Sequence, residues 1–224
     1  MMQMVREGST ELALEIRSET ITCHAGKFLT VEKENILVIS DLHLGKIDHF
    51  RKHGLGLPGG LDKHDLHLLE DIFLQQRPDL CIFLGDLFHS DYNKSWDQFA
   101  SFIGQFKTID FLLVEGNHDI LHPELYAACG MNTTAEFKVG SLSFTHEPRP
   151  GDEDCYNIHG HIHPGYQLTG KARQRLTLPC FHFGQNAATM PAFGRFTGLH
   201  PIQPRVDDQL VLISGSALYP IQMV

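Results

Sequence analysis

The sequence NILVISDLHL, residues 35–44, joins an uninterrupted apolar run, Ile36 to Ile39, to the polar residues Asp41 and His43. An apolar run of this length with polar or charged neighbours is typical of a central strand that is buried on both faces. We therefore expect a strand over residues 35–40, with Asp41 and His43 in the loop that follows it.

Two later segments repeat this pattern. The run DLCIFL (79–84) leads into Gly85-Asp86, and IDFLLV (109–114) leads into a polar segment that ends in Asn117-His118-Asp119. Between the three runs, apolar residues recur at helical spacing over 61–76 and 95–106. Alternating strands and helices predict βαβ units and a largely parallel sheet, in which ligands bind beyond the carboxyl ends of the strands.

The rest of the chain has a more β-like character, with frequent glycine and proline after residue 130. We expect short strands at residues 11–16, 19–24, 134–139, 141–146, 165–169, 174–178 and 210–213. No repeat or linker divides the sequence, so we expect one domain over residues 1–224.

The composition is ordinary for a soluble α/β protein, with 42% hydrophobic and 20% charged residues among 224. No apolar run approaches the roughly 18 residues needed to cross a bilayer, and residues 1–10 lack an apolar signal segment. We expect a cytoplasmic protein with no membrane contact. The five cysteines are odd in number and form no CxxC pair, which argues against disulfides and against a cysteine zinc site.

The formal net charge is −9. A protein that holds nucleic acid along a broad face usually has a basic surplus. The charge therefore favours small anionic substrates or single-strand ends over long duplex, unless a basic patch or bound metals supply local positive charge.

The 15 histidines gather in short clusters beside Asp, Asn and Gly. Each cluster alone is compatible with a plain turn. Together they supply one set of donors: carboxylates of Asp41 and Asp86, the amide oxygen of Asn117, and the imidazoles of His43, His146, His161 and His163. Mixed nitrogen and oxygen donors suit Mn²⁺, Fe or Zn²⁺ better than Ca²⁺, and Asp86 has two oxygens with which to bridge two ions.

The ordered set D-x-H, G-D, G-N-H-D, H and G-H-x-H resembles the signature of the calcineurin-like metallophosphoesterase superfamily. That resemblance implies an αββα four-layer sandwich with two divalent ions, most commonly Mn²⁺, at the strand ends. It assigns Asp41, His43, Asp86 and His163 to the first ion. It assigns Asp86, Asn117, His146 and His161 to the second, with Asp86 bridging.

A closer resemblance covers nearly the whole chain. The segments DLHLGKIDHFRKHG (41–54), LGDLFHS (84–90), PCF (179–181) and PAFGRFTG (191–198) are similar to the ICC-like phosphoesterases linked in bacteria to a DNA ligase and a helicase. This implies a DNA-damage-response phosphodiesterase or endonuclease, with DNA as candidate substrate and the ligase and helicase as candidate pathway partners.

The mechanism that we hypothesise for this family is in-line attack on phosphorus by a hydroxide held between the metals. His118 would protonate the leaving oxygen, and Asp119 would either orient His118 or simply cap a turn. Arg51, His89 and Arg149 are candidate phosphate contacts. The side chains of Phe181, Phe183, Phe193 and Phe196 could stack on bases, although core packing is the commoner role at such positions.

Two other functions remain open from the sequence. One is hydrolysis of a small phosphate substrate, such as a cyclic nucleotide, a nucleoside diphosphate derivative or a phosphomonoester. The other is a non-catalytic scaffold with this fold, which the complete donor set and His118 disfavour. The sequence does not determine the oligomeric state.

Overall fold

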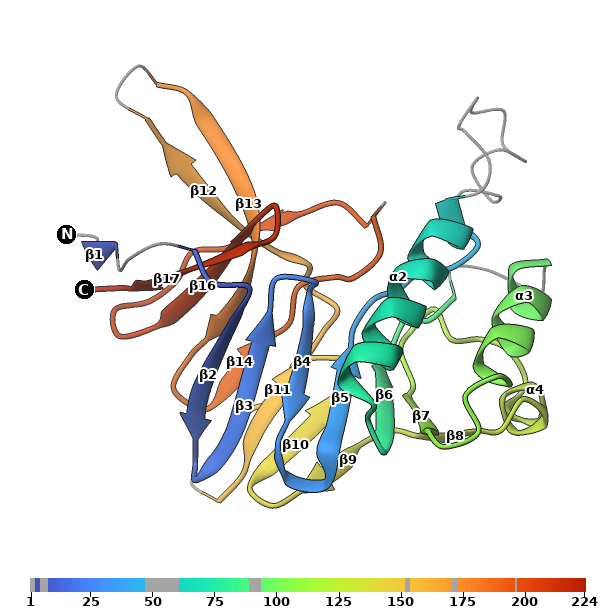
Figure 1. The fold of residues 1–224 in the computed structure, drawn as a ribbon. Helices are drawn as coiled ribbons and strands as arrows, with labels where there is room; N and C mark the ends of the chain where they lie inside the picture. Colours follow the sequence, from blue (N-terminus) through green and yellow to red (C-terminus); the bar gives the residue numbers. More distant parts are fainter. Residues whose placement is uncertain are drawn as a thin grey trace.

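The computed structural model describes residues 3–4, 8–46, 61–88, 94–151, 154–170, 173–195 and 197–224. Within these residues, two β-sheets pack face to face and three helices pack against the first sheet (Figure 1). The α/β class and the two packed sheets of the expected αββα four-layer sandwich are therefore confirmed, and the three described helices form the layer on the first sheet.

The first sheet has seven strands in the order β2-β3-β4-β5-β6-β7-β8. Strands β2 to β5 are antiparallel, and β5 to β8 are parallel. The three strands predicted as buried are confirmed as β5, β6 and β7. The bounds are β2 Glu11–Ile16, β3 Glu19–His24, β4 Phe28–Val31, β5 Ile36–Ile39, β6 Leu80–Leu84, β7 Asp110–Val114 and β8 Met131–Thr134.

The second sheet follows the path β1-β17-β16-β13-β14-β11-β10-β9, with β12 paired to β13 and to β15. Strands β10 and β11 are parallel, as are β11 and β14. The bounds are β1 Gln3–Met4, β9 Phe137–Val139, β10 Leu142–Thr145, β11 Tyr156–His159, β12 Pro164–Thr169, β13 Arg175–Phe183, β14 Ala187–Thr189, β15 His200–Pro201, β16 Gln209–Ser214 and β17 Ala217–Gln222.

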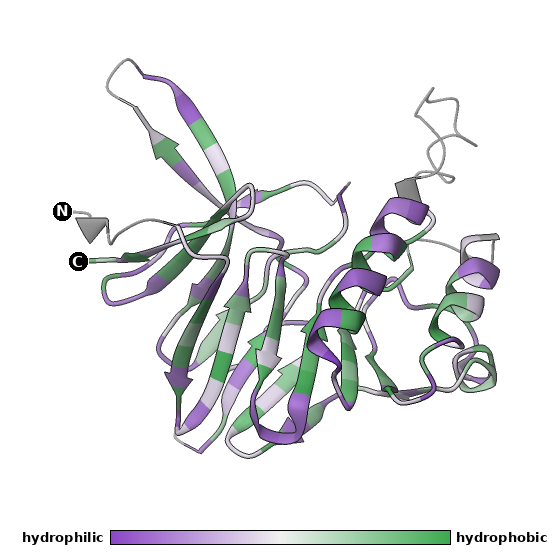
Figure 2. Cartoon of the chain, in the orientation of Figure 1, coloured by the Kyte–Doolittle hydropathy of each residue, from purple (hydrophilic) through white to green (hydrophobic). Residues whose placement is uncertain are grey.

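The helices are α2 (Leu61–Gln76), α3 (Lys94–Ile103) and α4 (Pro123–Ala128), and a 3-10 turn, η1 (Lys33–Asn35), precedes β5. Their apolar sides, which include Phe73 of α2 and Phe99 of α3, pack on the first sheet in one core cluster. A second cluster, with Phe144 and Phe181 at less than 2% exposure, fills the space between the sheets. Figure 2 shows this division, with hydrophobic colour along the strands and hydrophilic colour on the outward side of α2.

Several expected boundaries were wrong. The strand expected over 134–139 is two strands in different sheets, because the chain turns at Glu136, whose carbonyl accepts a hydrogen bond from the Thr134 hydroxyl. The helix expected over 95–106 ends at Ile103, and Phe106 packs on Phe73 from the following turn instead. The strand expected over 174–178 runs to Phe183. Strands β1, β4, β11, β14, β15 and β17 and helix α4 were not anticipated.

None of the helices in the described ranges combines the length and the apolar character needed to cross a bilayer. No disulfide joins the five cysteines, all of which lie in the described ranges.

Candidate metal centre

The predicted donor residues follow the carboxyl ends of parallel strands in both sheets. Asp41 and His43 follow β5, Asp86 follows β6 and Asn117 follows β7, while His146 follows β10 and the pair His161 and His163 follows β11. Parallel neighbours end at the same edge of a sheet, so each sheet delivers its donors to one edge. The face-to-face packing of the two sheets then brings both sets together.

The first group consists of Asp41, His43 and His163, whose donor atoms all lie within 4.8 Å of one another. His163 Nε2 is 3.2 Å from Asp41 Oδ1. The rings of His43 and His163 meet edge to face with their centroids 5.4 Å apart. Two donors from β5 and one from β11 thus converge on one small volume.

The second group consists of Asp86, His146 and His161. His146 Nε2 lies 3.3 Å from Asp86 Oδ1 and 3.1 Å from His161 Nδ1. The same nitrogen is 3.2 Å from Asn117 Oδ1. Donor atoms of Asp86, Asn117 and His161, from three other loops, therefore lie within 3.3 Å of His146 Nε2.

Asp86 joins the two groups. Its Oδ1 faces His146, and its Oδ2 lies 3.6 Å from His43 Nε2 in the first group. The two carboxylate oxygens thus face opposite groups, which is the arrangement that a bridging ligand needs.

The backbone around these residues is unusual. Asp41, His43, Asp86, His161 and His163 all have positive φ angles between 50° and 68°. Non-glycine residues adopt this left-handed region uncommonly, and such strain gathers where function requires a particular side-chain direction. Five of the seven predicted donors share this conformation, which supports a functional rather than an incidental cluster.

Two glycines allow the loops to approach one another. A Cβ on Gly85, which has φ +75°, would lie 2.1 Å from His146 Nδ1. A Cβ on Gly160 would lie 1.9 Å from Ser40 Oγ and 2.6 Å from Asp41 Oδ2. The glycines of the G-D and G-H-x-H segments are therefore required by the close contact between the loops.

The sequence did not reveal the groups that orient the imidazoles. His146 Nδ1 is 3.1 Å from the Leu84 carbonyl oxygen, and His163 Nδ1 is 3.0 Å from the Thr197 carbonyl oxygen. A carbonyl can only accept, so each Nδ1 carries the hydrogen and each Nε2 is left to face the cluster. Leu84 and Thr197 both lie in segments quoted for the resemblance, 84–90 and 191–198, but the resemblance gave neither residue a role.

That segment also holds the loop after β5. The backbone N–H groups of Phe193 and Gly194 donate to the carbonyls of Ser40 and Asp41 at 2.8 and 3.1 Å. The Ser40 hydroxyl and the His161 backbone N–H both donate to the Asp41 carboxylate. Asp41 is thereby fixed from three directions.

The local electrostatics favour opposite charges on Asp41 and His163. Burial raises the pKa of the Asp41 carboxyl, but the hydrogen bond and charge of His163, with help from Ser40 and His146, bring it below its ordinary value. Burial lowers the pKa of the His163 imidazole, and contact with Asp41 outweighs this and raises it. The carboxylate therefore stabilises a positive charge at this position, whether on a proton or on a metal.

The donors fit a pair of divalent cations. His163 Nε2 is buried and faces Asp41 Oδ1 at 3.2 Å, so a nitrogen and a carboxylate oxygen point toward the same small volume. Ligand atoms bound at about 2.1 Å to a shared cation are roughly 3.0–3.4 Å apart. The spacings of 3.1 to 3.3 Å around His146 Nε2 fall in this range.

One side of the cluster is open. Asp41, His43, Asp86 and His146 are buried at 6% exposure or less. Asn117 and His161 are exposed, and His118 is partly exposed. A substrate would therefore approach over Asn117, His118 and His161.

His118 lies beside the cluster. Its backbone N–H donates to Asp86 Oδ1 at 3.0 Å, and its ring lies 5.5 Å from that of His43 between centroids. The structure thus brings His118 to the metal centre, where the sequence expected a proton donor.

Asp119 contacts the backbone of two loops. Its Oδ1 accepts from the N–H of Leu87 at 2.9 Å, and its Oδ2 accepts from the N–H of Gly116 at 2.9 Å. Burial, together with the nearby charge of Asp86, raises the pKa of the Asp119 carboxyl to about 6 despite these hydrogen bonds. Asp119 was expected either to orient His118 or to cap a turn, and these contacts with backbone N–H groups favour the turn cap.

The other expected contacts have different outcomes. The Arg149 guanidinium donates to Glu136 Oε2 at 3.2 Å, and its contact with phosphate stays a prediction. Arg51 and His89 lie outside the described residues. Phe181, Phe183 and Phe193 are buried at 5% exposure or less, so they pack in the core rather than presenting faces to bases. Phe196 is also outside the described residues.

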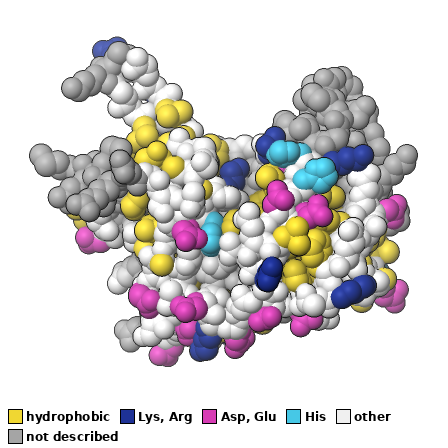
Figure 3. All heavy atoms as spheres, viewed as in Figure 1, with side chains coloured by type: hydrophobic (Ala, Val, Ile, Leu, Met, Phe, Trp, Pro, Cys, Tyr) yellow, Lys and Arg dark blue, Asp and Glu magenta, His cyan; other side chains and the backbone are white. Residues whose placement is uncertain are grey.

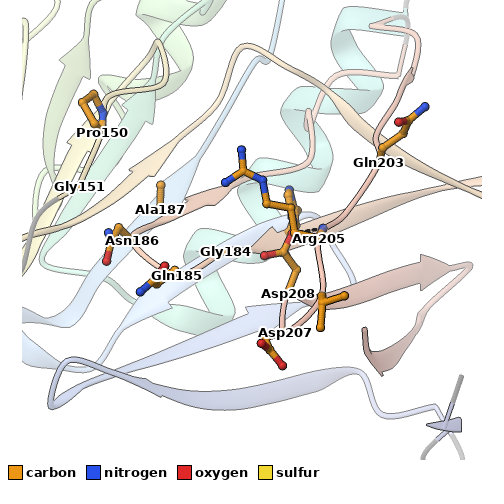
Figure 4. Close-up of a pocket in the computed structure, with 12 residues that line it drawn as sticks. Pro150, Gly151, Gly184, Gln185, Asn186, Ala187, Gln203, Arg205, Asp207 and Asp208 are labelled. Carbon is orange, nitrogen blue, oxygen red and sulfur yellow. Dashed lines mark hydrogen bonds and ion pairs between the residues drawn. The ribbon is translucent and has the colours of Figure 1, made fainter. Parts of the chain in front are cut away.

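A separate hollow of about 870 Å³ lies between the loop at Pro150, the β13–β14 turn and residues 203–208 (Figure 4). None of the seven predicted donors lines it. Asp208, on its wall, is already paired with His182 at 2.8 Å and accepts from the Arg205 backbone N–H at 2.7 Å. We therefore place the chemistry at the histidine cluster.

Comparison with known proteins agrees with this fold. The sequence model of the family described as calcineurin-like phosphoesterase matches residues 34–188. The chain therefore belongs to the calcineurin-like phosphoesterase family, and it is a phosphoesterase. No curated protein matches the sequence.

Among solved structures, the Pseudomonas putida nuclease MPE superposes with a TM-score of 0.79 at 24% identity, covering 94% of this chain and 99% of that one. A protein of unknown function from Aquifex aeolicus has a TM-score of 0.42 at 18% identity, with 57% and 78% covered. The phosphoesterase Yfce from E. coli has a TM-score of 0.40 at 12% identity, with 80% and 88% covered. The first of these similarities supports the fold.

Asp119→Ala should destabilise the protein, because it leaves the N–H groups of Leu87 and Gly116 without their acceptor. We expect a loss of about 1–3 kcal/mol in the free energy of unfolding, measured by urea denaturation in the presence of a chelator. Asp119→Asn keeps one acceptor oxygen and removes the repulsion with Asp86, so it should lose less. Equal stability of the alanine variant and the unsubstituted protein would show that the cap contributes nothing.

Proposed function

We propose that this phosphoesterase hydrolyses phosphodiesters with two divalent metal ions, and that nucleic acid is its substrate class. The observation that carries the proposal is the pair of donor groups joined through Asp86, whose two oxygens face His146 on one side and His43 on the other. Two adjacent cation positions suit a phosphoryl centre, on which both the attacking and the leaving oxygen need stabilisation.

In this proposal Asp41, His43, Asp86 and His163 hold one ion, and Asp86, Asn117, His146 and His161 hold the other. Mn²⁺ is the ion that we expect, because carboxylate, amide and imidazole donors together suit it. When bound, the ions supply the charge that lowers the pKa of water and offsets the charge of the phosphoryl oxygens.

The chain's own residues supply orientation and a proton. The Leu84 and Thr197 carbonyls hold the imidazoles of His146 and His163 with Nε2 directed into the cluster. His118, on the accessible side, would donate a hydrogen bond to a phosphate oxygen and pass its proton to the leaving oxygen. The backbone hydrogen bond from His118 to Asp86 keeps that imidazole in register with the donors.

The choice of nucleic acid and of a DNA-damage-response role rests on the likeness of residues 41–54, 84–90, 179–181 and 191–198 to phosphoesterases linked to a DNA ligase and a helicase. The similarity in fold to a bacterial nuclease is consistent with this choice. We propose the ligase and helicase as partners in the same pathway.

Asp86→Asn should remove metal binding, because it replaces one oxygen ligand of the bridging carboxylate with an amide nitrogen that has no lone pair to offer. We expect about two manganese ions per chain in the unsubstituted protein, and an affinity lowered by more than about 100-fold in the variant. Plasma mass spectrometry after dialysis measures this. The matched control is Asp71→Asn, which changes an exposed aspartate on α2 and should retain the full metal content.

Substrate preference tests the proposed reaction. The manganese-loaded protein should hydrolyse bis(4-nitrophenyl) phosphate with a higher kcat/KM than 4-nitrophenyl phosphate, and it should cut plasmid or oligonucleotide DNA. Cyclic nucleotides and nucleoside diphosphate derivatives complete the panel. A clear preference for the monoester, or hydrolysis of the small nucleotides without any cleavage of DNA, would refute the proposed substrate class.

His118→Ala should lower turnover of the diester by about 10²–10⁴ through loss of the proton donor, while metal content stays unchanged. The effect should shrink for substrates with a good leaving group such as nitrophenolate, because that group needs little protonation. Comparing kcat for nitrophenyl and alkyl diesters measures this difference. Full activity on both substrates would rule out the role of His118.

A further inference from the structure

The acidic residues are distributed very unevenly along this chain. Residues 155–206 contain no Asp or Glu, although the chain has 27 acidic residues and a net charge of −9. The same stretch contains Lys171, Arg173, Arg175, Arg195 and Arg205. It also includes the predicted donors His161 and His163. One side of the candidate metal centre is therefore built from a positively charged, acid-free part of an acidic protein.

Much of this stretch forms a projecting hairpin. Strands β12 and β13 pair from Gly165–Pro179 to Thr169–Arg175, and the turn is closed by hydrogen bonds between Gly170 and Gln174 and between Arg173 and Gly170. Figure 1 shows the hairpin extending from the molecule at the end where the parallel strands of the first sheet terminate. In Figure 3 its tip carries a basic side chain, whereas acidic side chains gather along the lower edge of the same view.

The hairpin has two different faces. Tyr166, Leu168 and Leu178 lie on one face and pack against Leu210 and Ile221 of β16 and β17 in a small core. The register places Gln167 opposite Thr177 and Thr169 opposite Arg175, and these pairs lie on the other face, where Gln167, Thr169 and Arg175 are exposed. The apolar face therefore braces the hairpin and leaves its polar face available.

The arginines at the tip are not neutralised. Arg173 and Arg175 are exposed and form no ion pair with any described residue. At the other end, Pro164 directly follows the predicted donor His163, so the base of the hairpin adjoins the cluster. Arg195 is next to Gly194, whose N–H donates to the Asp41 carbonyl. The Arg195 guanidinium lies 3.9 Å from the Asp65 carboxylate, so the charge of this stretch that forms no ion pair within the described residues is at the far end of the hairpin.

The dimensions suit a strand of nucleic acid. A β-strand rises about 3.3 Å per residue, so the six residues of β12 span about 20 Å. One strand of a duplex carries a phosphate about every 3.4 Å along its axis, so this distance corresponds to roughly six nucleotides. Short substrates would bind at the cluster without reaching the tip.

We propose that the β12–β13 hairpin is a contact arm for the phosphate backbone of nucleic acid, with Arg173 and Arg175 binding phosphates several nucleotides from the scissile bond. This inference rests on the proposed function and adds to it the place where the polymer lies. It also accounts for binding of a polyanion by a protein with a net negative charge, because the acidic residues, which would repel phosphate, all lie outside this arm.

The test compares Arg173→Gln/Arg175→Gln with a control that removes the same charge elsewhere. The control is Arg77→Gln/Lys107→Gln, because these exposed residues precede β6 and β7 at the opposite edge of the first sheet. Binding is measured by fluorescence anisotropy of a labelled 20-nucleotide DNA duplex. The manganese-loaded protein carries His118→Ala in every case, so that the probe persists.

We expect the hairpin variant to reduce the slope of log K against log salt concentration by about 2, and to weaken binding at least about tenfold at 0.1 M salt. The control variant should change neither value. Arg173→Lys/Arg175→Lys should restore the slope, because it returns the charge. With His118 restored, hydrolysis of bis(4-nitrophenyl) phosphate should be the same in all these proteins, since that substrate does not reach the tip.

An unchanged salt slope and affinity in the hairpin variant would overturn the proposal. So would a loss of self-association without a loss of DNA affinity, which would assign the hairpin to contacts between copies of this chain. If the protein turns over the small diester but neither binds nor cuts DNA, the proposed substrate class fails, and the arm fails with it. If it cuts DNA and the hairpin variant behaves like the control, only the arm fails.

Discussion

Two carboxylates, Asp41 and Asp86, lie at 0% and 3% exposure where the two sheets meet. Removing a charged carboxylate from water costs several kcal/mol unless hydrogen bonds and opposite charge compensate. The protein provides both, through the Ser40 hydroxyl, the backbone N–H groups of His161 and His118, and the surrounding imidazoles. The conformations of the loops after β5, β6, β7, β10 and β11 bring these compensating groups to the two carboxylates.

That need explains the strained backbone. Side chains that leave strand ends in the ordinary extended conformation would diverge across the faces of their sheets. A left-handed residue at Asp41, His43, Asp86, His161 and His163 turns each donor inward instead. Glycines at positions 85 and 160 remove the side chains that would collide with His146 and Ser40. Strain of order 1–3 kcal/mol at each such residue is sustained because the surrounding core fixes the strands from which the loops emerge.

The distribution of charge bears on the proposed substrate. A net charge of −9 alone disfavours a polyanionic ligand. The acid-free stretch 155–206 differs locally, because it begins beside the donor cluster at His161 and His163 and carries Arg173 and Arg175 at the far end of its hairpin. The net charge of the chain thus disfavours a polyanionic ligand, whereas the charge of this stretch favours one. Association of nucleic acid would then depend on the local field near the cluster and the hairpin.

The sequence alone determined the central strands, the two longer helices and the identity of the predicted donors. Successive side chains of an apolar run such as Ile36–Ile39 point to opposite faces of the strand, so both faces must be buried to remove them from water. The polar residues at its end then lie in the loop that follows. These are local consequences of hydrophobic pattern, which is why β5, β6 and β7 were predicted correctly from sequence.

The family resemblance implied how the donors are grouped, but only the tertiary structure gives the physical reason for that grouping. His146 meets Asp86 and Asn117 because β10 and β11 of one sheet end beside β6 and β7 of the other, and no local pattern encodes that packing. The same holds for the Leu84 and Thr197 carbonyls, since any residue has a carbonyl and its direction depends on the fold. Arg149 is a further case: it follows His146 by three residues and its guanidinium pairs with Glu136, a contact that depends on how the chain turns and that the local sequence does not encode.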